Sequence, residues 1–242
     1  MAKLMKINVV SLVCFYSTLG ILSAQSLVSN THQTAIPGPV VYSGQWIAAG
    51  IQTGPAPAQI DSVTLYQATT GVPNGSFTVS IYSDALSSLT NPYHVPGGVL
   101  PGGVLNGPST PVGSGYQTYT TTQPLLFAPN SIFWIVASSD AIDAMAPLNN
   151  TFGWGSSAGA DYQSSSGWSV LTEADGSNGS YPAYSTSQGA GWLPSNLSPL
   201  LFEVGGTVVP EPGTMVLFGA GMVALLILSR RRSIARGKSR AK

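Results

Sequence analysis

The basic residues of this chain lie only at its two ends, and this limits how the rest can fold. Lys3 and Lys6 open the sequence, every other Lys or Arg lies between Arg230 and Lys242, and residues 7–229 contain none. All nine acidic residues lie in that interval. The interval therefore cannot be stabilised by Lys or Arg salt bridges. It also lacks the cationic surface that binds a phosphate backbone, which excludes nucleic acid as a partner.

Residues 1–26 have the pattern of a secretory signal peptide. Two lysines precede a mainly apolar stretch over residues 9–22, and small residues follow it. Cleavage after Ala24 and cleavage after Ser26 both fit, and an uncleaved membrane anchor is the alternative. Cys14, the single cysteine, lies inside this segment. The exported protein is therefore predicted to contain neither a disulfide nor a thiolate nucleophile.

Residues 27–206 show the periodicity of β-strands. Phe77, Val79 and Ile81 alternate with polar residues, as in a half-buried strand, and residues 132–136 form an apolar run typical of a strand covered on both faces. Turn signals such as 73–75 and 128–130 separate these runs, and no window has a helical stripe. We predict an all-β body, an antiparallel β-sandwich or jelly roll. The tandem duplication over 96–105 is predicted to be a surface loop.

The C-terminal residues 207–242 combine three parts. Pro210, Glu211 and Pro212 come first, residues 213–229 form an apolar stretch near the short limit for a transmembrane helix, and Arg230, Arg231 and Arg232 follow. These arginines can snorkel to the headgroups and act as a membrane stop. Basic residues flanking a membrane segment stay on the cytoplasmic side, so both ends point inward and the body lies outside.

This combination resembles the PEP-CTERM sorting signal of Gram-negative bacteria. The resemblance implies an exosortase-like membrane protease or transpeptidase as partner, transient residence in the inner membrane, and delivery to the cell surface or extracellular matrix. The family co-occurs with exopolysaccharide and biofilm production. A plain single-pass anchor with a chance Pro-Glu-Pro is the alternative. The order of strands in residues 45–205 also resembles the choice-of-anchor sandwich domains, the R type in particular, which are generally of unknown function.

Calcium is the only cofactor that the acidic residues suggest. Asp140 and Asp143 follow a predicted strand, and Asp175 lies in a segment of oxygen-bearing side chains, residues 173–178. Calcium takes six to eight oxygen ligands, and extracellular modules often bind it weakly. An Asp-Gly pair such as 175–176 is also an ordinary turn former, so both interpretations stay open.

Aromatic residues gather in and beside the Gly/Ser-rich stretch over residues 153–191. Trp154, Trp168 and Trp192 are candidates for stacking on sugar rings, because neutral-glycan sites combine apolar faces with a few polar groups. The alternative is that these rings pin long loops onto the sandwich.

No catalytic residue is predicted. The only histidines are His32 and His94, and the single Gly-any-Ser-any-Gly pattern, at 155–159, lacks the strand and helix that a nucleophile elbow needs. The sequence therefore favours a non-enzymatic surface or matrix protein associated with exopolysaccharide. The alternatives are a neutral-glycan-binding module and a secreted carbohydrate-active enzyme whose carboxylates would be Glu173 and Glu203.

Overall fold

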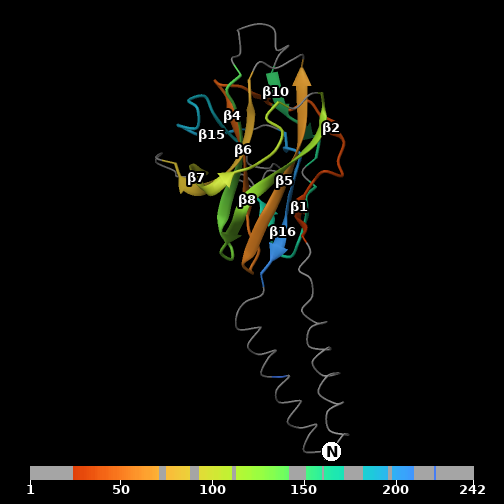
Figure 1. The fold of residues 1–242 in the computed structure, drawn as a ribbon, viewed down its shortest axis with the longest axis vertical. Helices are drawn as coiled ribbons and strands as arrows, with labels where there is room; N and C mark the ends of the chain where they lie inside the picture. Colours follow the sequence, from red (N-terminus) through yellow and green to blue (C-terminus); the bar gives the residue numbers. More distant parts are fainter. Residues whose placement is uncertain are drawn as a thin grey trace, which may run out of the picture.

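The computed structural model of the chain describes residues 24–70, 75–87, 93–110, 113–141, 151–159, 161–171, 182–195 and 198–209, together with Gly221. Apart from that single position, the regular structure of these residues consists of β-strands, and the strand pairs are antiparallel. They form two main sheets, one of them curled into a half-barrel (Figure 1). The all-β prediction is confirmed for this part of the chain, and the jelly-roll alternative stays a prediction.

The first sheet is built around the long strand β5. Along one edge β5 pairs with β16 and then with β10, and along its other edge it pairs with β8. The strands in order are β12 (Gln163–Ser164), β1 (Gln25–Ser29), β16 (Phe202–Val208), β5 (Ala58–Thr70), β10 (Thr151–Trp154) and β3 (Val40–Val41), with β8 (Gly115–Phe127) on the far edge of β5.

The second sheet carries β9 at its centre, between β4 and β6. Its order is β15 (Leu193–Pro194), β14 (Pro182–Ser185), β4 (Trp46–Gln52), β9 (Ile132–Ser139), β6 (Phe77–Leu86) and β7 (His94–Val104), and β13 (Ser169–Val170) also pairs with β4. A separate small pair joins β2 (Ala35–Ile36) to β11 (Ser156–Ser157).

Strand β9 shows how the second sheet is covered on both faces. Phe133 and Ile135 point into the main core between the sheets, whereas Trp134 and Val136 belong to a second apolar cluster on the outer face. All four side chains are fully buried. Side chains alternate between the faces of a strand, so an unbroken apolar run requires cover on both sides. The prediction for residues 132–136 is confirmed.

The duplicated segment over 96–105 was wrongly predicted to be a loop. Most of it lies in β7, which pairs with β6 at the edge of the second sheet. An edge strand needs hydrogen bonds to a neighbouring strand on one side only. It therefore tolerates Pro96 and Pro101, which have no N–H to donate. The register shifts between Ser80 and Tyr82 and again beyond Tyr82, as in β-bulges.

The two predicted ends lie mostly outside the described residues. Strand β1 begins at Gln25 and pairs Gln25 and Ser26 with β16, so cleavage after Ala24 would leave that strand whole. The predicted transmembrane helix over 213–229 lies outside them except for Gly221, and so do residues 210–212 and 230–232. Among the residues that the structure places, no helix has the length and apolarity needed to cross a membrane.

Candidate functional site

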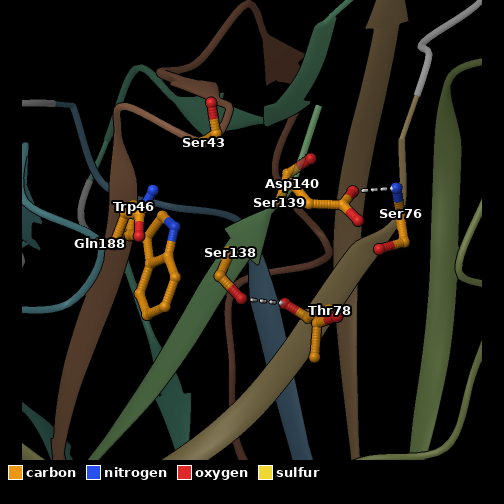
Figure 2. Close-up of a pocket in the computed structure, with 8 residues that line it drawn as sticks. All are labelled: Ser43, Trp46, Ser76, Thr78, Ser138, Ser139, Asp140 and Gln188. Atoms are coloured by element: carbon orange, nitrogen blue, oxygen red, sulfur yellow. Dashed lines mark hydrogen bonds between the residues drawn. The ribbon is translucent and has the colours of Figure 1, made fainter. Parts of the chain in front are cut away.

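A polar hollow of about 350 Å³ opens on the outer face of the second sheet, where β4 and β6 begin and β9 ends. This volume is at the small end of the roughly 300–1,000 Å³ typical of ligand pockets. Figure 2 shows Trp46 and Gln188 on one side, Ser76 and Asp140 on the other, and Ser138 between them. The residues that line the hollow are Ser43, Trp46, Ser76, Thr78, Ser138, Ser139, Asp140 and Gln188. We call this the Trp46 hollow.

A tight turn and the strand alternation place Trp46. Tyr42 and Gln45 exchange backbone hydrogen bonds of 3.0 and 2.9 Å around a two-residue turn, and Ser43 N donates to Ala141 O at 2.9 Å. Ile47 then points into the main core, which turns Trp46 to the outer face. The indole Nε1 of Trp46 is buried and has no hydrogen-bond acceptor among the described residues.

Asp140 is held at the rim by the start of β6. The backbone N–H of Ser76 donates to Asp140 Oδ1 at 2.5 Å, and Asp140 N donates to Ser76 O at 3.3 Å. The hydrogen bond from the Ser76 backbone lowers the pKa of this exposed carboxyl below its usual value. Asp140 is therefore a carboxylate at neutral pH. Gly75 lets the segments approach, since a Cβ there would lie 2.5 Å from Ala141 N.

The turn after β14 closes the hollow beside Trp46. The buried Ser185 hydroxyl donates to Ala190 O at 2.5 Å and accepts from Gly189 N at 3.1 Å. Gln188 is in the left-handed region at φ 52°, an uncommon conformation for a residue other than glycine. Gly189 lies against the indole, because a Cβ there would lie 2.6 Å from a Trp46 ring carbon.

The chemistry of the Trp46 hollow suits a neutral polyhydroxyl ligand. Five hydroxyl side chains and one amide line it, and each can both donate and accept hydrogen bonds. Asp140 adds a strong acceptor, and Trp46 adds a donor and an apolar ring. No Lys or Arg exists between residues 7 and 229 to balance an anionic ligand, so a phosphate or carboxylate ligand would be repelled by Asp140.

A second hollow, of about 390 Å³, lies across the same turn and is mostly apolar. Trp192, Tyr93 and Val95 contribute to its wall, as do Gly189 and Gly191 of the turn. The indole Nε1 of Trp192 is also buried without an acceptor among the described residues. The β14–β15 turn therefore divides two hollows, one polar and one apolar.

The comparison with protein families identifies the C-terminal segment. Residues 208–232 match the PEP-CTERM protein-sorting motif. The chain carries a PEP-CTERM motif. This motif implies processing by an exosortase, export and sorting to the cell surface. No curated protein and no solved structure matches the chain, so the resemblance to choice-of-anchor domains finds no support.

The three tryptophans predicted to stack on sugars are buried in the body of the protein. Trp154 is fully buried and donates from Nε1 to Leu201 O at 2.9 Å, while Trp168 and Trp192 are 4% and 6% exposed. Trp168 also packs edge-on against Phe133. Rings this deeply buried leave little face for a sugar, although Trp192 also lines the second hollow, and stacking by these three residues stays a prediction. Their contacts are those of the alternative, in which rings pin loops onto the sandwich.

The predicted calcium ligands are only partly described. Asp140 lines the Trp46 hollow, but Asp143 and Asp175 lie outside the described residues. Within the described residues no cluster of three or more His, Cys, Asp or Glu side chains occurs. Calcium binding by Asp140, Asp143 and Asp175 therefore stays a prediction.

Sequence reasoning missed two features of the outer face. Trp46 was not singled out, although its position next to the inward Ile47 is the signal that could have found it. Asp84 was not connected with His94, yet Asp84 accepts hydrogen bonds from Trp134 Nε1 at 3.0 Å and pairs with His94 Nδ1 at 2.7 Å. This pairing depends on the irregular register between β6 and β7.

Among the described residues, Ser157 of the Gly-any-Ser-any-Gly pattern and His94 lie in different sheets. Ser157 lies in the small β2–β11 pair and donates to Gly159 O, whereas His94 lies in β7 of the second sheet. Glu203 lies on β16, with Thr31 as a long 3.5 Å hydrogen-bond partner. Glu173 lies outside the described residues, so the pair of Glu173 and Glu203 is not tested.

Proposed function

We propose that this protein is a non-enzymatic component of the cell surface or extracellular matrix that associates with extracellular polysaccharide after its C-terminal signal is processed. The observation that carries the proposal is the PEP-CTERM motif over residues 208–232. Its processing releases a body without Lys or Arg, whose surface suits a neutral, hydrated matrix. Biofilm is the setting in which such a component would act.

The described body supports a binding role more than a catalytic one. Its polar hollow combines hydroxyls, an amide, one carboxylate and an indole. General acid–base hydrolysis of a glycoside uses two carboxyl groups that flank the bond. The lining residues supply one, Asp140.

Fractionation of the matrix tests the proposal. The full-length gene is expressed in biofilm-forming cells, the washed matrix is digested with glycoside hydrolases, and the protein released is quantified. We expect the protein to sediment with the undigested matrix and to be released by digestion. Recovery in the soluble fraction before digestion would contradict association with polysaccharide.

Reducing-end assays on the purified secreted protein test the non-enzymatic part. We expect no release of sugar from the matrix polysaccharide. If release occurs and is abolished by Glu173→Gln or Glu203→Gln, the protein is a carbohydrate-active enzyme and the proposal is wrong.

A further inference from the structure

We infer that the Trp46 hollow is the site at which the protein binds a neutral sugar unit of the polysaccharide. The inference rests on the proposed function and gives it a place and a ligand class. It concerns a different ring from the three of the sequence prediction, because Trp46 lines the polar hollow.

The indole N–H of Trp46 has no hydrogen-bond acceptor among the described residues. Buried polar groups in proteins nearly always have a hydrogen-bond partner, and each exception requires an explanation, of which a functional role is one. Trp46 Nε1 is buried without a protein acceptor among the described residues, and Trp46 lines the hollow. In Figure 2 the edge of the ring that carries this nitrogen faces the side where Asp140 and Ser139 lie. An acceptor that enters from that side, such as a sugar hydroxyl, would complete the hydrogen bonding of this N–H.

The side chains that line the hollow have the hydrogen-bonding groups that a sugar needs. Sugar hydroxyls both donate and accept, and a site for them needs both kinds of group beside an apolar surface. Ser138 supplies a hydroxyl between the indole and Asp140, with Thr78 O as a long 3.5 Å acceptor. Thr78 adds a second hydroxyl to the lining, and Gln188 adds an amide. The carboxylate and the absence of any Lys or Arg in residues 7–229 select against uronic acids and phosphates.

Hydrogen bonds hold the rim of the hollow in place before any ligand binds. The rim is fixed by backbone hydrogen bonds from Ser43 to Ala141 and between Asp140 and Ser76. Gln188 is held at φ 52° in a turn that Ser185 organises. Such backbone strain persists only where its surroundings impose it, and it clusters at ligand sites. A rigid hollow loses little entropy when a ligand enters.

Affinity electrophoresis of the mature protein, recovered from the surface of cells that express the full chain, tests this inference. The probes are the neutral exopolysaccharide fraction of those cells, which is not retained by an anion exchanger, and the acidic fraction, which is. We expect the neutral fraction to retard the wild-type protein. Trp46→Phe keeps an aromatic ring but removes the N–H, and we expect it to weaken retardation about tenfold.

Two more variants complete the test. Asp140→Asn changes an exposed carboxylate at little risk to folding and should also weaken retardation about tenfold. Tyr116→Ala removes an aromatic side chain that is 42% exposed on the first sheet and should leave retardation unchanged. Thermal melts of each variant confirm that it is folded.

The outcomes separate the site from the proposed function. Equal retardation of wild type, Trp46→Phe and Asp140→Asn would overturn the site and leave polysaccharide association standing. Retardation by the acidic fraction alone would overturn the neutral ligand class. A wild-type protein that neither fraction retards would overturn the site and the proposed association together.

Discussion

The two ends of the chain and the body between them differ in almost every physical property. The ends carry all of the Lys and Arg, whereas residues 7–229 carry every Asp and Glu. The described body consists of two antiparallel sheets whose inner faces form a continuous apolar core. The ends are defined by short motifs, and the PEP-CTERM motif over 208–232 is the clearest of them.

This difference teaches that destination and fold are encoded independently. The body is stabilised by apolar packing and backbone ladders, without Lys or Arg ion pairs, so neutralising or removing the ends breaks no salt bridge in it. Conversely, the motif depends on residues that follow the last described strand, β16 (Phe202–Val208). Substitutions should therefore affect either sorting or stability, and a substitution that affects both would contradict this independence.

The largest effect is expected from replacing the motif. A variant with Pro210, Glu211 and Pro212 all changed to Ala should lose nearly all processing, because the exosortase signal is gone. Immunoblots of cell fractions should show an unprocessed, membrane-associated protein. Glu203→Gln, a change to a body glutamate, is the matched control and should be processed normally. Normal processing of the triple variant would show that the motif does not direct sorting.

The largest effect on the body is expected from Phe133→Ala. This fully buried ring lies 4.6 Å from the Phe127 ring, centroid to centroid, and contacts Trp168. Truncating a buried Phe costs about 3–5 kcal/mol of the free energy of unfolding. Urea unfolding measures it, with Leu126→Ala, 70% exposed, as a control expected within about 0.5 kcal/mol of wild type. The recovered Phe133→Ala protein should still be processed at its C-terminus.

A smaller, pH-dependent effect is expected at Tyr119. Burial raises the pKa of this phenol well above its ordinary value near 10, although the hydrogen bond from Gln67 opposes the shift. A raised folded-state pKa gives stability that is complete below pH 10 and is lost as the pH rises above it. Wild type should therefore lose stability between pH 9 and 12 more steeply than Tyr119→Phe. Parallel melting curves for the two proteins would contradict this assignment.

The smallest effect is expected at Asp140. Its lowered pKa means that the carboxylate contributes stability above the unfolded value near 3.8, and this contribution is lost as the pH falls through the lower folded value. Melting temperatures at pH 7 and near pH 3 should therefore differ slightly less for Asp140→Asn than for wild type. A larger difference for the variant would mean that the hydrogen bond from Ser76 does not favour the charged form.

The strands could be predicted from the sequence where apolar and polar residues alternate regularly. The outward and inward residues of β6 and β9 follow from period-two patterns, and the turn at residues 128–130 contains Asn130 at φ 53°. Strand β7 could not be predicted from the sequence, because its Pro-Gly pairs are typical of loops. An edge strand tolerates them, since it needs hydrogen bonds on one side only. Its bulges also hid the Asp84–His94 pair, since counting residues across an irregular register gives the wrong facing partners.

The candidate site was harder to predict because it joins four distant segments. Asp140 was singled out for its charge, and the structure places it in the Trp46 hollow. Its neighbours come from the turn before β4, the start of β6 and the turn after β14, and no sequence spacing links them. The role of Trp154, Trp168 and Trp192 could not be read from the sequence, because large aromatic rings occur in cores as readily as in binding surfaces.

The most direct test of the separation between ends and body is mass spectrometry of the mature protein, recovered separately from the inner membrane, the cell surface and the medium. The account predicts a surface or released protein whose N-terminus lies near Gln25 and whose C-terminus lacks Arg230 to Lys242. A protein that retains Lys242 and remains in the inner membrane would contradict it.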